Sequence, residues 1–132
     1  MIEPIGSFKI VWQDQCIIET YFTTNDITKE DLNIIYQKTK NAKYITSGTT
    51  FQEQVWQAIL QIPYGETRTY KDIAIAINKP KAYRAVANAC GKNKLPMIIP
   101  CHRVVGVNHI GGYTYQYGNC KKLKQFILDY EK

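Results

Sequence analysis

Residues 50–91, TFQEQVWQAILQIPYGETRTYKDIAIAINKPKAYRAVANACG, decide the fold because they encode three short helices in close succession. Thr50 and Glu53 have the spacing of a capping box, in which each side chain satisfies a backbone amide of the first helical turn. Apolar residues then recur along one face of a helix: Phe51, Val55, Ala58, Ile59 and Ile62. The tripeptide at residues 63–65, Pro-Tyr-Gly, ends this first helix.

Two further helices follow, and the turn between them is short. Thr69 caps the second helix, with Asp72 at its third position. Residues 78–80, Asn-Lys-Pro, form a tight turn. The third helix runs through residues 81–90 and ends at Gly91. Two helices joined in this way resemble a helix-turn-helix, although an ordinary helical hairpin gives the same pattern.

The N-terminal third of the chain has a different pattern. Residues 8–22 alternate in polarity and then carry the run CIIETYF, which predicts extended strands with a turn at residues 13–15. A short helix follows, with Thr28 as its cap and Asp31 three residues later. Its inner face holds Leu32, Ile35 and Tyr36. Residues 41–49 have no strong period and are interpreted as a linker.

The chain ends in another amphipathic helix, with Asn119 as a candidate cap. One face of this helix carries Leu123, Phe126, Ile127 and Tyr130. We therefore expect an α+β protein. A small N-terminal α/β unit at residues 1–48 precedes a mostly helical domain at residues 49–132, which contains the helix-turn-helix.

Charge is distributed unevenly along the chain. Residues 1–50 carry five basic and six acidic side chains, whereas residues 51–132 carry twelve basic and five acidic ones. A basic excess confined to one part indicates a polyanionic partner for that part, or else a solvated basic surface. No apolar run is long enough to cross a bilayer, and the N-terminus lacks the pattern of a signal peptide. We expect a cytoplasmic protein with no membrane association.

Four cysteines and two histidines are present, and none of the cysteines form a C-x-x-C pair. This pattern fits neither a zinc site nor a small disulfide framework, so we expect reduced thiols, no metal and no cofactor. Three of the cysteines are interpreted as apolar fillers: Cys16, Cys90 and Cys120.

The fourth cysteine lies in an apolar segment, LPMIIPCHRVVG, at residues 95–106. Pro100 fixes one backbone torsion just before Cys101 and can aim its side chain into a cavity. A nucleophilic cysteine needs a group that accepts its proton, and His102 is the nearest candidate. Neighbouring side chains of a strand point to opposite faces, so this pair works only if the chain turns here. A carboxylate behind the imidazole would stabilise its cationic form. The candidates in this part are Glu53, Glu66, Asp72, Asp129 and Glu131.

The sequence resembles the O6-alkylguanine-DNA alkyltransferases, also called methylated-DNA–protein-cysteine methyltransferases. Pro-Cys-His-Arg-Val at residues 100–104 matches their active-site signature. The segments FQEQVWQAILQIPYGETRTYKDIA, PKAYRAVANACGKN and PMIIPCHRVVG follow that family in order and spacing. The resemblance is strong over residues 50–112 and moderate over the last helix. It implies repair by direct reversal, in which a methyl or other alkyl group moves irreversibly from O6 of guanine, or O4 of thymine, to the protein.

The resemblance also implies roles for individual residues. Cys101 is the alkyl acceptor, and His102 holds its proton through a water molecule. Glu131 orients His102, and Tyr70 donates to the flipped guanine so that the base leaves in a protonated form. Asn93 braces the active-site turn. Arg103 belongs to the signature, either as an ion-pair partner within the protein or as a DNA contact.

For DNA, the resemblance implies that the helix-turn-helix docks in the minor groove of a duplex and that the damaged base is rotated into a pocket. Arg84 fills the gap left in the base stack. The remaining residues of the expected binding set are Thr69, Ala82, Tyr83, Val104, Tyr113 and Tyr117. The protein is expected to act as a monomer.

The chain departs from the family pattern at several places. Tyr83 replaces a residue that is usually small, and either stacks on a sugar or points inward. Lys94 stands where proline commonly follows the asparagine. The segment after residues 111–113 is longer than usual, so either Tyr113 or Tyr117 closes the pocket.

Two other functions compete with this interpretation. A non-catalytic lesion-binding relative would flag damage for other repair, but such relatives carry another residue in place of the cysteine. A Cys-His hydrolase would not explain the basic helix-turn-helix or the matches around Tyr70 and Arg84.

Overall fold

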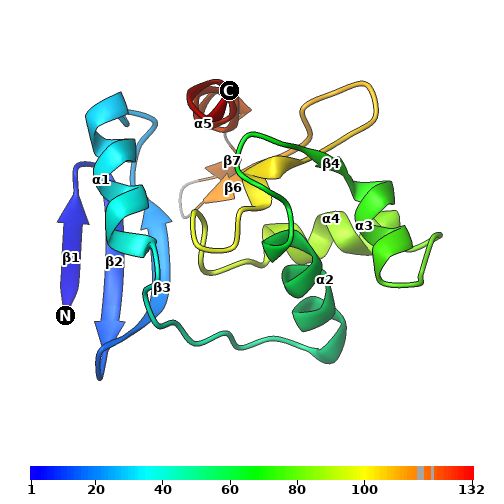
Figure 1. Cartoon of the computed structure of the whole chain (residues 1–132), viewed down its shortest axis with the longest axis horizontal. Coiled ribbons are helices and arrows are strands. Elements are labelled where there is room, and N and C mark those ends of the chain that lie inside the picture. Colours follow the sequence, from blue (N-terminus) through cyan, green and yellow to red (C-terminus); the bar gives the residue numbers. More distant parts are fainter. Residues whose placement is uncertain (116–117, 120) are drawn as a thin grey trace.

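The N-terminal unit is a three-stranded antiparallel sheet with one helix packed on it (Figure 1). The computed structural model describes residues 1–115, 118, 119 and 121–132. Strands β1 (Ile2–Ile5), β2 (Phe8–Gln13) and β3 (Cys16–Phe22) lie in that order, and α1 (Lys29–Thr39) follows. Asp14 and Gln15 both have positive φ, as a two-residue hairpin turn requires, so the expected turn is confirmed. Strand β1 was not expected. Pro4 interrupts its apolar pattern, which an edge strand tolerates.

Helix α1 begins as expected, whereas helix α2 (Thr50–Leu60) is capped one residue earlier than expected. Thr28 and Asp31 form the capping box of α1. In α2 the box pairs Thr49 with Gln52, so the expected pair of Thr50 and Glu53 is wrong. The sequence Thr-Thr-Phe-Gln-Glu offers two equivalent registers. Glu53 is instead engaged by Thr46, whose hydroxyl donates to its carboxylate over 2.8 Å.

The helix-turn-helix consists of α3 (Tyr70–Ala76) and α4 (Tyr83–Gly91), which follow the short strand β4 (Arg68–Thr69). Thr69 and Asp72 form the capping box of α3, as expected. The turn uses Asn78 at positive φ. Helix α4 begins at Tyr83 rather than at residue 81. Ala82 provides no side-chain cap, and its amide is bonded back to the carbonyl of Lys79 within the turn.

After α4 the chain returns to the start of α3. The short 3₁₀ helix η1 (Cys101–Arg103) leads into β5 (Val104–Val105), which pairs in parallel with β4. This pairing joins Arg68 to Val104 and Thr69 to Val105, so the Cys-His-Arg turn lies beside the first residues of α3. Strands β6 (Thr114–Tyr115) and β7 (Gly118–Asn119) form a small hairpin before α5 (Lys121–Glu131). Asn119, the expected cap, lies in β7, and the residue between it and α5 is outside the described part.

The two parts of the chain share one hydrophobic core. Thr20 of β3 is buried, and its hydroxyl donates to the carbonyl of Pro96 over 2.7 Å. Its amide also bonds to the carbonyl of Lys94 over 2.9 Å. These bonds fix the sheet against the segment that leads to Cys101. Among the described residues no helix is long and apolar enough to span a membrane.

Candidate active site

Cys101 stands on a sharp turn centred on Pro100. The amide of Cys101 donates to the carbonyl of Ile99 over 2.7 Å, and Pro100 has φ −79° and ψ 65°. These are the torsions of an inverse γ-turn. The 3₁₀ turn follows immediately, so Cys101 and His102 do not alternate as they would on a strand. Cys101 and His102 were expected to act together only if the chain turns at this point, and the structure has such a turn.

Asn93 holds both the turn and the thiol. Its Nδ2 donates to Sγ of Cys101 over 3.1 Å and to the carbonyl of Ile99 over 3.0 Å. Its Oδ1 accepts from the amide of Leu95 over 2.8 Å. One amide side chain thus ties the end of α4 to the cysteine. The bracing that the resemblance implies for Asn93 is matched by these contacts, although Lys94 replaces the usual proline.

The resting site holds a protonated thiol. The hydrogen bond with Cys90 raises the pKa of Cys101 well above its ordinary value, and burial adds to this. The amide of Asn93 and the charge of Lys124 act in the opposite direction but do not outweigh burial and the Cys90 contact. Any reaction of this sulfur as a thiolate would therefore need a group that accepts the thiol proton.

His102 and Glu131 form a buried pair behind the cysteine. His102 Nε2 lies 2.8 Å from Oε2 of Glu131, and neither residue is appreciably exposed. If Nε2 carries the proton, as the carboxylate favours, Nδ1 keeps its lone pair. Nδ1 is buried and has no partner among the described residues. Burial lowers the pKa of His102, while Glu131 opposes this by stabilising the cation.

Glu131 stays ionised because several donors surround it. Burial alone would raise its pKa, but hydrogen bonds from His102 and Arg103 outweigh that effect and hold the pKa well below its ordinary value. Arg103 donates to both carboxylate oxygens, each over 2.9 Å, and also to the carbonyl of Ile62 over 3.0 Å. Arg103 is therefore an internal ion-pair partner, which decides between the two alternatives that the sequence left open.

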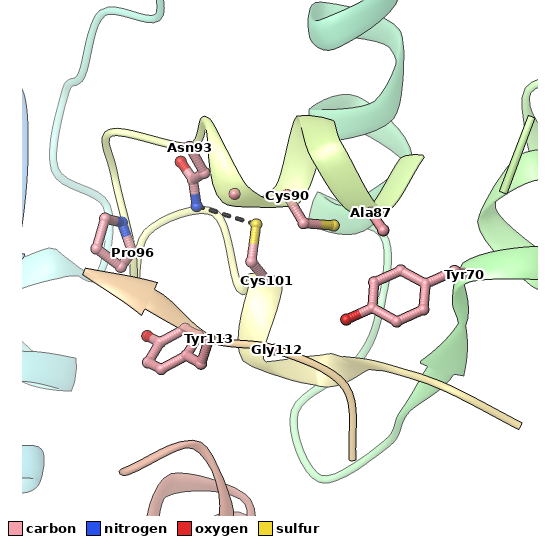
Figure 2. A pocket seen from close by; sticks show the side chains of 9 residues that line it. Tyr70, Ala87, Cys90, Asn93, Pro96, Cys101, Gly112 and Tyr113 are labelled. Carbon is pink, nitrogen blue, oxygen red and sulfur yellow. Dashed lines mark hydrogen bonds between the residues drawn. The ribbon is translucent and has the colours of Figure 1, made fainter. Parts of the chain in front are cut away.

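A cavity of about 130 Å³ opens in front of the thiol (Figure 2). The turn at Cys101, the end of α4, the start of α3 and the segment before β6 surround it. Its lining consists of Tyr70, Ala87, Cys90, Gly91, Asn93, Pro96, Cys101, Gly112 and Tyr113. Cys90 was expected to be an apolar filler, and the structure adds that it forms part of the cavity wall. It is half-buried and shares the cavity with the thiol of Cys101.

Tyr70 enters the cavity from the first turn of α3, with its hydroxyl toward the Cys101 side (Figure 2). Burial raises its pKa to about 12, partly offset by the backbone amide of Gly112, so it remains a proton donor at neutral pH. Gly111 has φ +79°, and a side chain there would collide with the Tyr70 hydroxyl. Glycine is therefore required at this position on both grounds.

Tyr113 closes the cavity opposite Tyr70. It is buried, and its ring makes an edge-on contact with His102 at 6.4 Å between centroids. Of the two tyrosines that the sequence offered, the structure brings Tyr113 into the cavity. Tyr117 lies outside the described residues.

The remaining expected DNA contacts gather at the helix-turn-helix rather than in the cavity. Arg84 is exposed in the first turn of α4, and Tyr83 beside it is 46% exposed and points outward. Tyr83 and Thr69 both line a shallow hollow between α3, α4 and the loop after β5. Ala82 is half-buried at the start of α4. Val104 is buried in β5 beside the turn, and its contact with DNA or with the damaged base stays a prediction.

Sequence reasoning also missed Lys124. It is fully buried on α5, and its Nζ donates to the carbonyls of Val104 over 2.6 Å and Gly112 over 3.0 Å. Burial lowers its pKa to about 8, while the nearby thiols of Cys90 and Cys101 oppose this. The position of Lys124 in the last helix was the signal that could have revealed it. Lys124, Ile127 and Glu131 share one helix face, and a lysine on a buried face indicates a special role.

Comparisons with known proteins agree with this geometry. The family described as 6-O-methylguanine DNA methyltransferase, DNA binding domain, matches residues 50–132. A probable methylated-DNA–protein-cysteine methyltransferase of Acanthamoeba polyphaga mimivirus is 49% identical across 97% of this chain and 91% of its own length. A methylated-DNA–protein-cysteine methyltransferase of Methanosarcina barkeri is also 49% identical, across 68% of this chain, and the match spans 55% of that protein.

The fold is similar to that of a solved relative as well. The crystal structure of Mycobacterium tuberculosis OGT in complex with DNA superimposes with a TM-score of 0.77 and 31% identity. The match covers all of this chain and 90% of the other. The likeness therefore includes the N-terminal unit, which the family match at residues 50–132 does not reach.

Proposed function

The chain belongs to the methylated-DNA–protein-cysteine methyltransferase family, and on that premise we propose that Cys101 accepts an alkyl group from O6 of guanine in duplex DNA. The observation that carries this proposal is the position of the Cys101 thiol. It faces a cavity whose other walls supply a phenol, Tyr70, and an amide, Asn93. The mimivirus and M. barkeri relatives are named for transfer of a methyl group from DNA to a protein cysteine.

The reaction forms one bond and breaks another. The sulfur of Cys101 attacks the alkyl carbon, the bond from that carbon to O6 breaks, and the thiol proton passes toward Nδ1 of His102 through a water molecule. Glu131 stabilises the imidazolium that results, as in other carboxylate–histidine pairs. The product is a thioether, which has no leaving group that water could displace. Each molecule therefore acts once.

Departure of the base is assisted by Tyr70. A guanine anion is a poor leaving group, so a proton that Tyr70 delivers to the base during bond cleavage lowers the barrier. The thiol proton held by His102 then returns through solvent to the Tyr70 phenolate, so that both side chains end neutral. The phenol of Tyr70 faces the cavity from the side opposite Asn93 (Figure 2), and burial keeps it protonated. Tyr113 then forms the wall that limits the size of the alkyl group. We propose that larger O6-alkyl groups enter the cavity only if the Tyr113 side chain moves aside.

DNA would reach the cavity by base rotation from a helix-turn-helix docked in the minor groove. Arg84 is exposed at the start of α4 and carries a planar guanidinium that can stack in the vacated position. Nearby lysines would meet phosphates: Lys71, Lys79, Lys81, Lys92 and Lys94. We propose that residues 49–132 act on DNA as a monomer inside the cell, supported by the unit at residues 1–48. O4-alkylthymine is a candidate second substrate.

The proposal is tested by separating binding from transfer. Wild-type protein and Cys101→Ala are mixed with duplex DNA that carries one labelled O6-methylguanine. We expect both proteins to bind, and only the wild type to become labelled. Label on Cys101→Ala would exclude Cys101 as the acceptor. Lesion-dependent binding by the wild type with no label would point to a protein that flags damage without repairing it.

A further inference from the structure

The carboxylate of Glu131 receives a donor that the catalytic turn does not supply. His102 and Arg103 account for three contacts, and the fourth comes from the hydroxyl of Tyr36. A carboxylate oxygen has about two lone-pair positions, so the way these four contacts divide between the two oxygens matters. Tyr36 belongs to α1 in the N-terminal unit, 95 residues away along the chain. The N-terminal unit thus contacts the catalytic pair directly.

Three of the four donors converge on one oxygen. His102 Nε2, Nη2 of Arg103 and the Tyr36 hydroxyl all meet Oε2 of Glu131, whereas Nε of Arg103 alone meets Oε1. Donors that share one oxygen compete for its charge, because each bond withdraws electron density from the others. The Tyr36 bond therefore weakens the pull that Glu131 exerts on the imidazole of His102.

The ring of Tyr36 is fixed independently of this bond. It stacks on Tyr130 at 5.8 Å with an interplanar angle of 8°, and meets Tyr64 edge-on at 5.5 Å. Burial raises the pKa of Tyr36 far above its ordinary value, and the neighbouring carboxylate raises it further. The phenol is thus a permanent donor across the range in which proteins are stable. Its direction is set by aromatic packing from α5 and the loop after α2.

We propose that Tyr36 is a positioning residue for alkyl transfer: its hydroxyl fixes the Glu131 carboxylate and limits how strongly that carboxylate draws a proton onto His102. The catalytic part of this inference rests on the proposed function. The effect of Tyr36 on Glu131 and His102 does not depend on it. From the sequence, Tyr36 was expected merely on the inner face of a helix. The structure adds a chemical role to that packing role.

Other charged or titratable groups also face the pair and contribute to its proton affinity. They are Tyr64 of the loop after α2, Arg103 of η1, Tyr113 before β6, and Lys124 of α5. All of these are unchanged when only the Tyr36 hydroxyl is removed. Tyr36→Phe keeps the stacked ring and deletes one oxygen, so a change in His102 titration in this variant reports on that bond.

The test uses the fact that the chain has only two histidines, His102 and His109. Imidazole ¹⁵N shifts are followed against pH in the wild type, in Tyr36→Phe, and in Tyr44→Phe. Tyr44 lines the same surface hollow as Tyr36 but is not among the hydrogen-bond partners of Glu131. We expect the His102 midpoint to rise by about half a pH unit in Tyr36→Phe, the cost of one charge-assisted hydrogen bond shared among several donors. His109, and His102 in Tyr44→Phe, should not move.

A second variant keeps the hydrogen bond and strengthens it. Site-specific 3,5-difluorotyrosine at position 36 is a more acidic phenol and a stronger donor, so the His102 midpoint should move downward. Opposite shifts in the two proteins support the proposal, and they do so even if Tyr36→Phe is less stable. An unchanged His102 midpoint in both proteins, or the same shift in Tyr44→Phe, would overturn it.

Alkyl transfer then links the contact to catalysis. As pH is lowered, the rate of reaction with O6-benzylguanine should begin to fall at a higher pH in Tyr36→Phe than in the wild type, because His102 becomes protonated at a higher pH. If the wild type transfers no alkyl group while His102 still shifts, the proposed function fails and the Tyr36 contact stands. If the wild type transfers the alkyl group but the fall in rate at low pH occurs at the same pH in Tyr36→Phe, the catalytic role of Tyr36 is wrong and the proposed function stands.

Discussion

Nδ2 of Asn93 lies 3.1 Å from the sulfur of Cys101 while it also bonds to the carbonyl of Ile99, two residues earlier, over 3.0 Å. One side chain thus sets both the shape of the turn and the environment of the Cys101 thiol. Because the amide stabilises negative charge on sulfur, it assists the step in which the thiol proton is lost.

Asn93→Ala should therefore slow alkyl transfer and destabilise the fold. Three hydrogen bonds are lost, and the partly buried groups they satisfied are left unpaired, which costs about 1–3 kcal/mol of unfolding free energy. The measurements are urea unfolding and the rate with free O6-benzylguanine, which does not depend on DNA binding. Asn88→Ala, at an exposed position of α4, is the matched control and should change neither.

Lys124→Met should impair transfer although Lys124 lies on α5. The methionine fills a similar space but leaves the carbonyls of Val104 and Gly112 without their donor and removes a positive charge near the thiol. The pKa of Cys101 should rise further, so the rate with O6-benzylguanine falls at every pH. Lys122→Met, exposed on the same helix, should react at the wild-type rate. Equal rates in the two variants would contradict this role.

The buried pair should make stability fall in acid in two stages. The folded pKa of His102 is lowered, so unfolding takes up a proton and stability declines as pH falls below the ordinary value of 6.5. The folded pKa of Glu131 is lowered as well, so its contribution is fully present above the ordinary value of 4.5 and is lost as pH falls below it.

Glu131→Gln should remove the second stage and lower stability at neutral pH by about 3–5 kcal/mol, because Arg103 is left as a buried, unpaired cation. Urea unfolding from pH 3 to pH 7 compares the two proteins. Asp129→Asn, on the exposed side of α5, is the control. A wild-type curve that falls no more steeply below pH 4.5 than the curve of Glu131→Gln would mean that the folded pKa of Glu131 is not lowered.

Arg84→Ala should slow repair of duplex DNA far more than reaction with free O6-benzylguanine, since only the duplex requires a rotated base. Loss of stacking in the vacated position costs about 1–3 kcal/mol, or roughly tenfold to a hundredfold in rate. Lys92→Ala removes one charge from the end of the same helix and should weaken DNA binding only modestly. Equal losses of Arg84→Ala on both substrates would assign Arg84 a structural role.

Much of the fold could be predicted because its signals are local. Capping boxes at Thr28 and Thr69 and the turn at Asn78 depend on a few adjacent residues, and the structure confirms them. The adjacent threonines at 49 and 50 offered two capping registers with the same spacing, so sequence alone could not choose between them. Strand β1 was hidden because Pro4 breaks the pattern of a very short edge strand.

The site was harder to predict where it depends on pairing across the chain. Cys101, His102 and Glu131 were found through the family signature and the last helix. The pairing of β4 with β5, which brings Tyr70 beside Cys101, involves two residues on each side and has no periodic signal. The contact of Tyr36 with Glu131 joins two units, so only the packed structure reveals it. Lys124 alone carried a usable signal, a charge on a buried helix face.

The central claim is tested most directly by the mass of the intact protein after incubation with duplex DNA containing O6-methylguanine, followed by peptide mapping. The account predicts a gain of one methylene per molecule, saturating at one and located on Cys101. Cys90 is an internal control because it lines the same cavity and should stay unmodified. A methyl group on Cys90, or no gain in a folded protein with reduced thiols, would contradict the account.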